Sequence, residues 1–126
     1  MSAMGYELLV RSVYNCSRSG ANGADANIYR AMETAELSLT DIRWDKTREV
    51  KEQHYITTFT EVKKFVRNAL RNGLEKIKHR ATEQEVDRIK EMQCTLNKFH
   101  FYHKSELDII INTANGIFGK NGLVEG

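Results

Sequence analysis

Residues 58–103 contain two amphipathic segments joined by a short polar turn, and this stretch constrains the fold most. In residues 58–79 the apolar side chains recur every three or four positions, which is the period of one helix face. They are Phe59, Val62, Phe65, Val66, Ala69, Leu70, Leu74 and Ile77. Gly73 lies inside this apolar arc, where it costs roughly 1 kcal/mol relative to Ala. We therefore expect another helix to approach the backbone closely at Gly73.

The turn over residues 79–82 ends in a helix-start signal. Thr82 followed by Glu85 forms a capping box, in which each side chain binds the backbone amide of the other residue. The apolar seam that follows is narrower and consists of Val86, Ile89, Met92, Leu96 and Phe99. A short connection between two helices favours antiparallel neighbours, so residues 58–103 are predicted to form a long helical hairpin.

The length and composition suit one domain, and we treat residues 1–126 as a single unit. The chain has no proline, where average usage would give about 5%, and this is consistent with a helix-rich fold. A further helix is predicted over residues 105–119, with Ser105 near its cap and Gly119 near its end. Its apolar residues share one face, except Ile109, which lies on the opposite face.

The N-terminal half gives weaker signals. Residues 6–14 are rich in Val and Tyr and favour a strand, although their apolar positions also fit a short helix. Residues 15–25 have the composition of an exposed loop, and a helix is expected over residues 26–37. Residues 38–57 fit either a strand hairpin around residues 46–49, which we favour, or a helix. The predicted fold class is therefore α+β and predominantly helical, with a long αα-hairpin and a C-terminal helix packed against a small N-terminal β or extended region. An all-α bundle is the alternative.

Positive charge is concentrated in the first helix of the hairpin. Residues 60–80 carry seven Lys or Arg side chains against two Glu, whereas the whole chain has a net charge of +2. Lys64, Arg67, Arg71 and Lys78 fall within about 60° on a helical wheel, and Arg80 follows in the turn. Such a row would bind a phosphate backbone or an acidic protein surface. The alternative is a solvated helix face, since long basic side chains commonly cover helix edges.

An aromatic segment follows at residues 98–104. Phe99 belongs to the predicted core seam, whereas Phe101 and Tyr102 point elsewhere, so one of them is expected to be exposed. An exposed ring there would stack on a nucleobase or contact a partner protein. The alternative is packing against the rest of the fold. Together with the outward-facing Ile109, Phe101 and Tyr102 form the predicted partner-binding surface and suggest a homo-oligomer.

The glycine-rich loop is a weaker candidate site. Gly20 and Gly23 precede an expected helix, and backbone amides there would bind an anion with the help of Arg18. The spacing matches neither of the common phosphate-binding glycine motifs. A surface loop without a ligand is the alternative.

Metal and catalytic sites have little support in the sequence. His100 and His103 share a helix face and could join Cys94 or His54, but the spacing matches no standard zinc site. No hydrolase, metalloprotease or EF-hand motif is present. We therefore expect no metal and no cofactor, and a binding protein rather than an enzyme, although the enzyme question stays open.

The cellular setting is inferred from the cysteines and from hydropathy. Two isolated cysteines do not form a disulfide framework, and we expect them to be reduced in a cytoplasmic protein. We expect no signal peptide and no membrane span, because no apolar run approaches the roughly 20 residues that a span needs.

Three functions are compatible with these features. The first is a small non-enzymatic module that binds nucleic acid or a nucleoprotein through the basic row. The second is a regulator or inhibitor that docks on another protein. The third is a sequestering pocket for a small anionic ligand near Arg18.

Overall fold

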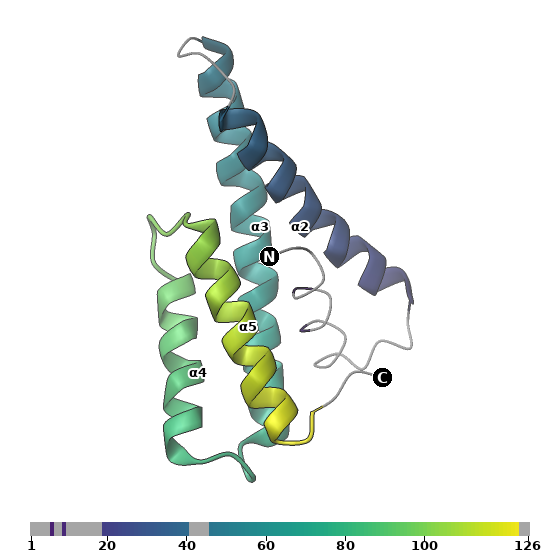
Figure 1. Cartoon of the computed structure of the whole chain (residues 1–126), viewed down its shortest axis with the longest axis vertical. Coiled ribbons are helices and arrows are strands. Elements are labelled where there is room, and N and C mark those ends of the chain that lie inside the picture. The colour runs from purple at the N-terminus through teal and green to yellow at the C-terminus, as the bar shows by residue number, and fades with distance from the viewer. Residues whose placement is uncertain (1–5, 7–8, 10–18, 41–45, 124–126) are drawn as a thin grey trace.

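The computed structural model of the chain describes Tyr6, Leu9, residues 19–40 and residues 46–123. This part contains four helices and no strand (Figure 1). They are α2 (Ser19–Thr40), α3 (Lys46–Ile77), α4 (Glu83–Leu96) and α5 (Lys104–Lys120). The predominantly helical prediction is confirmed, whereas the β component of the α+β prediction is not confirmed by these residues.

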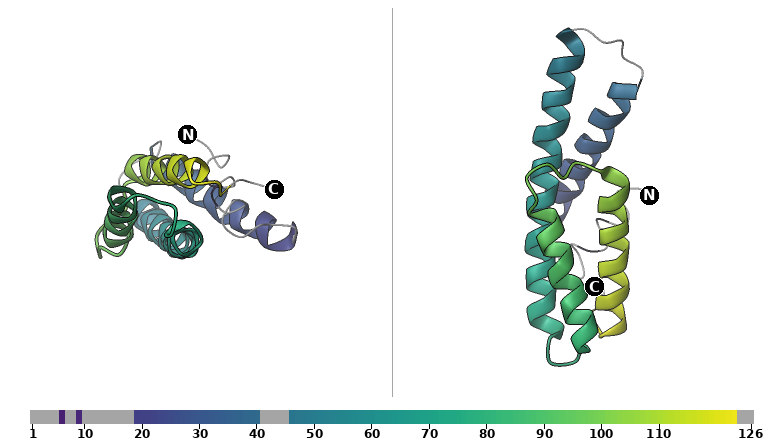
Figure 2. Two further views of the ribbon diagram at one scale, coloured as in Figure 1. Left: turned by 90° about the horizontal axis from the view of Figure 1, so that it is seen from below. Right: turned by 90° about the vertical axis from the view of Figure 1, so that its left-hand side faces the viewer.

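Helix α3 contacts every other helix of the described chain. Its 32 residues correspond to a length of about 48 Å. Helix α2 packs against the N-terminal half of α3 and diverges from it towards its own N-terminus (Figure 1). Helices α4 and α5 pack along the C-terminal half, and the end-on view in Figure 2 shows α3, α4 and α5 arranged as a triangle. The hairpin and the C-terminal helix thus form a three-helix unit.

The predicted strand hairpin around residues 46–49 is wrong, because α3 begins at Lys46 and runs through this region. Threonine favours strands, but the threonines of this region are accommodated in the helix by hydrogen bonds to preceding carbonyls. Thr57 Oγ1 donates to the Gln53 carbonyl at 2.9 Å, and Thr60 Oγ1 donates to the Ile56 carbonyl at 2.8 Å. Val50, an apolar residue of the pattern that resembles a strand, is exposed and has no sheet over it. Packing of α3 against α2 favours the helix over the strand that local propensity suggests.

The N-terminal predictions are only partly testable. Tyr6 and Leu9 are helical and fully buried, and the other residues of the predicted strand over 6–14 lie outside the described part. The loop predicted over residues 15–25 is wrong from Ser19 onward, where α2 begins, while residues 15–18 are not described. Small polar residues favour loops only weakly, and tertiary packing of the rest of α2 overrides that preference.

The end of α4 also differs from the prediction. The capping box at Thr82 and Glu85 is confirmed, with both reciprocal hydrogen bonds present. The helix ends at Leu96, with Asn97 as its C-cap, instead of continuing towards His103. Two cations of α3 bind carbonyls at this end and in the connection to α5, as described below. The predicted C-terminal helix is confirmed within one residue at each end, although its N-cap is His103, without a side-chain cap.

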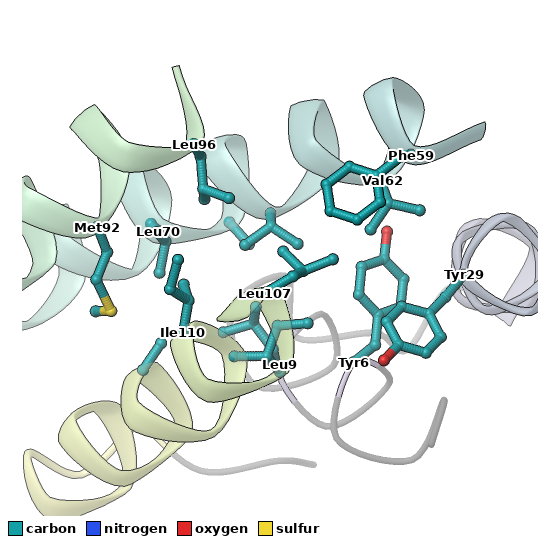
Figure 3. Packing of buried hydrophobic residues seen from close by; sticks show 14 of the residues in the cluster. Tyr6, Leu9, Tyr29, Phe59, Val62, Leu70, Met92, Leu96, Leu107 and Ile110 are labelled. Atoms are coloured by element: carbon teal, nitrogen blue, oxygen red, sulfur yellow. The ribbon is translucent and has the colours of Figure 1, made fainter. Parts of the chain in front are cut away.

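The hydrophobic core is centred where α2, α3 and α5 meet the N-terminal residues. The rings of Tyr6 and Tyr29 stack with centroids 5.0 Å apart beside Phe59 (Figure 3). Leu9 lies next to Leu107 of α5 in the same view. Further along α3, the core includes Leu70, which Figure 3 shows facing α4 and α5.

Gly73 allows α5 to approach α3. A Cβ atom at this position would lie within 2.9 Å of three ring atoms of Phe118, and that ring is fully buried and cannot move away. The close approach predicted from the sequence is confirmed.

We predict that Gly73→Ala lowers the free energy of unfolding by up to about 2 kcal/mol. Overpacking of a core typically costs about 1–3 kcal/mol, and the roughly 1 kcal/mol that alanine adds to helix stability offsets part of this cost. Urea unfolding followed by circular dichroism measures the change. The control is Gly116→Ala in α5, where nothing lies within 4 Å of the added Cβ atom. Gly116→Ala should raise stability, and an equal response of the two variants would contradict the close contact.

The capping box also ties the end of α5 to the start of α4. Glu85 Oε1 accepts hydrogen bonds from the Thr82 amide at 3.0 Å and from Asn121 Nδ2 at 3.1 Å. The Lys120 ammonium lies 3.2 Å from Oε2. The Thr82 hydrogen bond first, then that of Asn121, and the Lys120 charge favour the carboxylate and lower the pKa of Glu85 to about 2.

Because the pKa of Glu85 is lower in the folded state, its charge stabilises the fold above about pH 4.5, and this stabilisation is lost as the pH falls towards 2. We therefore expect Glu85→Gln to be less stable than wild type at pH 6, and the difference to shrink at pH 2.5. Urea unfolding at the two pH values measures this. Glu83→Gln, in the same helical turn but outside the box, is the control. If both variants lose the same stability at pH 6, the box carboxylate has no special role.

Candidate functional site

The predicted basic row lies on one side of α3, but its members have different surroundings. Lys64 and Arg71 are exposed, and the seven-residue spacing from Lys64 to Arg71 to Lys78 places them about 10.5 Å apart. Lys78 is exposed and lies 3.0 Å from Glu75. Arg67 is half-buried, and its Nη1 donates to the Leu96 carbonyl at 3.4 Å. Arg80 is exposed in the turn after α3.

Arg67 and Arg71 line one hollow of about 360 Å³ between α3 and α4. The other lining residues are Asn68, Gln93, Cys94 and Asn97, so the hollow has two guanidinium groups, three side-chain amides and no carboxylate. Arg71 Nη2 donates to Asn68 Oδ1 at 3.1 Å. We call this hollow the arginine groove.

The arginine groove has the chemistry of an anion site. A guanidinium group presents five N–H donors in a planar fork that matches phosphate and carboxylate oxygens. One hydrogen bond orients each arginine, which lowers the entropy lost when a ligand binds. The C-terminus of α4, at Asn97, carries about half a negative charge, and the two guanidinium charges outweigh it.

Lys63, which the site prediction did not include, is structural rather than exposed. It is 5% exposed, and its Nζ donates to the carbonyls of Lys98 at 3.3 Å and Phe101 at 3.0 Å. Nζ also lies 4.5 Å from the centroid of the Tyr102 ring. Burial, and then the charge of Arg67, lowers the pKa of Lys63. A signal existed in the sequence, because Lys63 lies four residues after Phe59 and falls within the apolar arc.

The aromatic segment differs from its prediction. Phe99 is 82% exposed, so its assignment to the core is wrong, because α4 ends before it. Phe101 is buried and Tyr102 is half-buried, and both rings pack edge-on against Phe59. Ile109 is exposed as expected. The partner-binding role of Phe101, Tyr102 and Ile109 and the homo-oligomer stay predictions.

The glycine segment does not form the loop predicted for anion binding. Gly20 and Gly23 lie within the first two turns of α2 instead of in a loop before it, and Arg18 is outside the described part. Gly23 is far enough into the helix for its amide to bond within it. Anion binding at this helix end stays a prediction.

A buried polar cluster, which the sequence analysis missed, joins α2 to α5. The Tyr29 hydroxyl donates to Asp108 Oδ1, and the Lys104 ammonium lies 2.8 Å from Asp108 Oδ2 and 3.5 Å from Glu33. Burial first, and then the bond to Asp108, raises the pKa of Tyr29. Burial alone would lower the pKa of Lys104, but Asp108 and Glu33 raise it. No local pattern predicts a contact between residues 79 positions apart.

The polar cluster is a weaker candidate for ligand binding than the arginine groove. A hollow of about 380 Å³ lies beside it, but its lining mixes Arg30 and Lys104 with Glu33 and Glu36. Charges that are already paired within the protein attract a ligand less than unpaired charges do. We therefore place the candidate functional site in the arginine groove.

The described residues contain no group of three His, Cys, Asp or Glu side chains placed to hold a metal ion. None of the helices in this part of the chain is both long enough and apolar enough to span a membrane.

Comparison of the chain with models of known protein families, with curated proteins and with solved structures found no match.

We predict that Lys63→Met lowers the free energy of unfolding by about 1–3 kcal/mol, because methionine fills a similar space but leaves the two carbonyls without their charged donor. Chemical denaturation measures the loss. The neighbouring Lys64→Met is the control, since an exposed lysine should change stability by no more than about 0.5 kcal/mol. Similar losses in both variants would show that the buried ammonium is not needed.

Proposed function

We propose that the protein is a non-enzymatic module that binds the phosphate backbone of nucleic acid through the arginine groove, with Lys64 and Lys78 extending the contact along α3. The observation that carries this proposal is the pairing of Arg67 and Arg71 in one hollow without a carboxylate. Guanidinium groups that have no carboxylate beside them in the groove, next to amide donors, suit phosphate oxygens.

The mechanism is charge neutralisation. Each lysine or arginine that contacts a phosphate releases condensed counterions, so that affinity falls steeply as salt rises. Two guanidinium groups in the groove and two lysines along α3 correspond to about four phosphate contacts and a slope of about −3 to −4 in a plot of log affinity against log salt. Backbone contacts of this kind carry little base specificity.

Arg71 is the better probe of the two arginines, because Arg67 also binds the end of α4. We predict that Arg71→Glu weakens binding of a fluorescein-labelled oligonucleotide more than tenfold at about 50 mM salt and reduces the salt slope by about one unit. Fluorescence anisotropy across a series of salt concentrations measures both quantities.

Arg88→Glu is the matched control. It makes the same change in net charge on an exposed position of α4, but it lies about 170° around that helix from the groove residues. It should bind within about threefold of wild type, a difference of roughly 0.7 kcal/mol. Equal losses in the two variants would indicate a general effect of net charge and would contradict the groove. Absence of salt-dependent binding in the wild type would reject the proposed function.

A further inference from the structure

Phe99 is the most exposed large apolar side chain in the described part of the chain. Its ring contacts His100 edge-on, with centroids 4.7 Å apart. Single exposed apolar residues are common on proteins, so exposure alone does not indicate a ligand. The position of Phe99 relative to the arginine groove is the informative observation.

Phe99 occupies a turn whose backbone is bound by a side chain of α3. The Phe101 amide donates to the Lys98 carbonyl at 3.4 Å, so Phe99 and His100 are the two central residues of the turn. The buried Lys63 ammonium binds the carbonyls at both ends of this turn. The backbone under the Phe99 ring is therefore ordered before any ligand arrives, which lowers the entropic cost of binding.

Two further hollows adjoin one another between the arginine groove and Phe99. A second hollow on the outer face of α4 shares Cys94 with the arginine groove. It shares Thr95 and Lys98 with a third hollow, of about 460 Å³, which Phe99 and His100 line. A flexible ligand can thus contact both the arginines and the aromatic ring.

The distribution of charge along these hollows indicates where a charged group of a ligand and where an uncharged group would bind. The second hollow balances two lysines with two carboxylates, namely Lys90, Lys98, Asp87 and Glu91. In the hollow of Phe99 the charges of Lys98 and Glu106 also balance. A phosphate is therefore favoured at the arginine end over the aromatic end. An uncharged ring with an exposed π-face suits the aromatic end.

We propose that Phe99 is a stacking surface for an unpaired nucleobase, and that the preferred ligand of the protein is single-stranded nucleic acid. This inference rests on the proposed function, because the arginine groove holds the backbone of the same strand. In a duplex the base faces are covered by neighbouring base pairs, so only an unpaired strand can offer a base to Phe99.

The test measures anisotropy with four labelled probes of equal phosphate number: a 12-nucleotide oligodeoxyuridine, the corresponding oligouridine, a 12-nucleotide abasic deoxyribose strand and a hairpin duplex with an abasic loop. The proteins are wild type, Phe99→Ala, Phe99→Leu and Phe99→Tyr. Circular dichroism and thermal melting confirm the fold of each variant.

We expect wild type to bind a base-containing single strand at least tenfold more tightly than the abasic strand or the duplex. Phe99→Ala should lose about five- to hundredfold for that strand, which is the typical effect of one stacked base. Its salt slope should be unchanged, because no phosphate contact is lost. Phe99→Tyr should retain binding, and Phe99→Leu should not. Oligodeoxyuridine and oligouridine carry the same base and differ only in the 2′-hydroxyl, so their comparison shows whether the strand is DNA or RNA.

Three results would overturn the inference while leaving the proposed function in place. They are unchanged affinity of Phe99→Ala, equal affinity of wild type for the abasic strand, and tighter binding of the duplex, each combined with loss of binding in Arg71→Glu. Full binding by Phe99→Leu would also overturn it, because the contact would then be apolar rather than aromatic. If no probe binds wild type at low salt, the proposed function and the inference fail together, and a protein partner becomes the explanation for the surface.

Discussion

The buried ammonium group of Lys63 fixes the connection between α4 and α5 on α3. A charged group with 5% exposure needs hydrogen-bond partners, and the carbonyls of Lys98 and Phe101 supply them. This requirement holds the connection between α4 and α5 against α3, so that Phe101 enters the core and Phe99 stays outside. One lysine thereby positions both the end of the arginine groove and the exposed ring.

Two polar regions in the structure show how charge can serve folding or binding. In the cluster of Tyr29, Asp108, Lys104 and Glu33, opposite charges meet, and the partners satisfy one another between α2 and α5. Removing these charges from water offsets much of the attraction between them, so the cluster is weak evidence for added stability. In the arginine groove two like charges lie together, each oriented by a neutral oxygen, so that their charge is available to an anion. This difference supports the assignment of binding to the groove.

Local patterns in the sequence predict much of the three-helix unit. Apolar periodicity, the Thr82–Glu85 box and Gly73 indicate the hairpin, its turn and the close approach of α5. The same reasoning fails at the N-terminal half of α3, where threonine and alternating polarity resemble a strand, because hydroxyl groups that bind preceding carbonyls are compatible with a helix.

The sequence predicts only part of the candidate site, because local patterns do not show contacts between different helices. Helical spacing predicts the basic row, but not that Arg67 and Arg71 share a hollow with Gln93 and Asn97 of a neighbouring helix. The end of α4 has no glycine or proline signal between Leu96 and His103. It depends on cations from another helix, and such contacts appear only when the chain has folded.

The distribution of contacts along the chain has a consequence for the order of folding. The four described helices follow one another through short connections, and closing short loops costs the least chain entropy. The bond between Tyr29 of α2 and Asp108 of α5 instead closes a loop of 79 residues. Pairing of helices that are neighbours in the chain, followed by contact between α2 and α5, is therefore the pathway of lowest entropic cost. The arginine groove, which lies between the neighbouring helices α3 and α4, would then form before the polar cluster that joins α2 to α5.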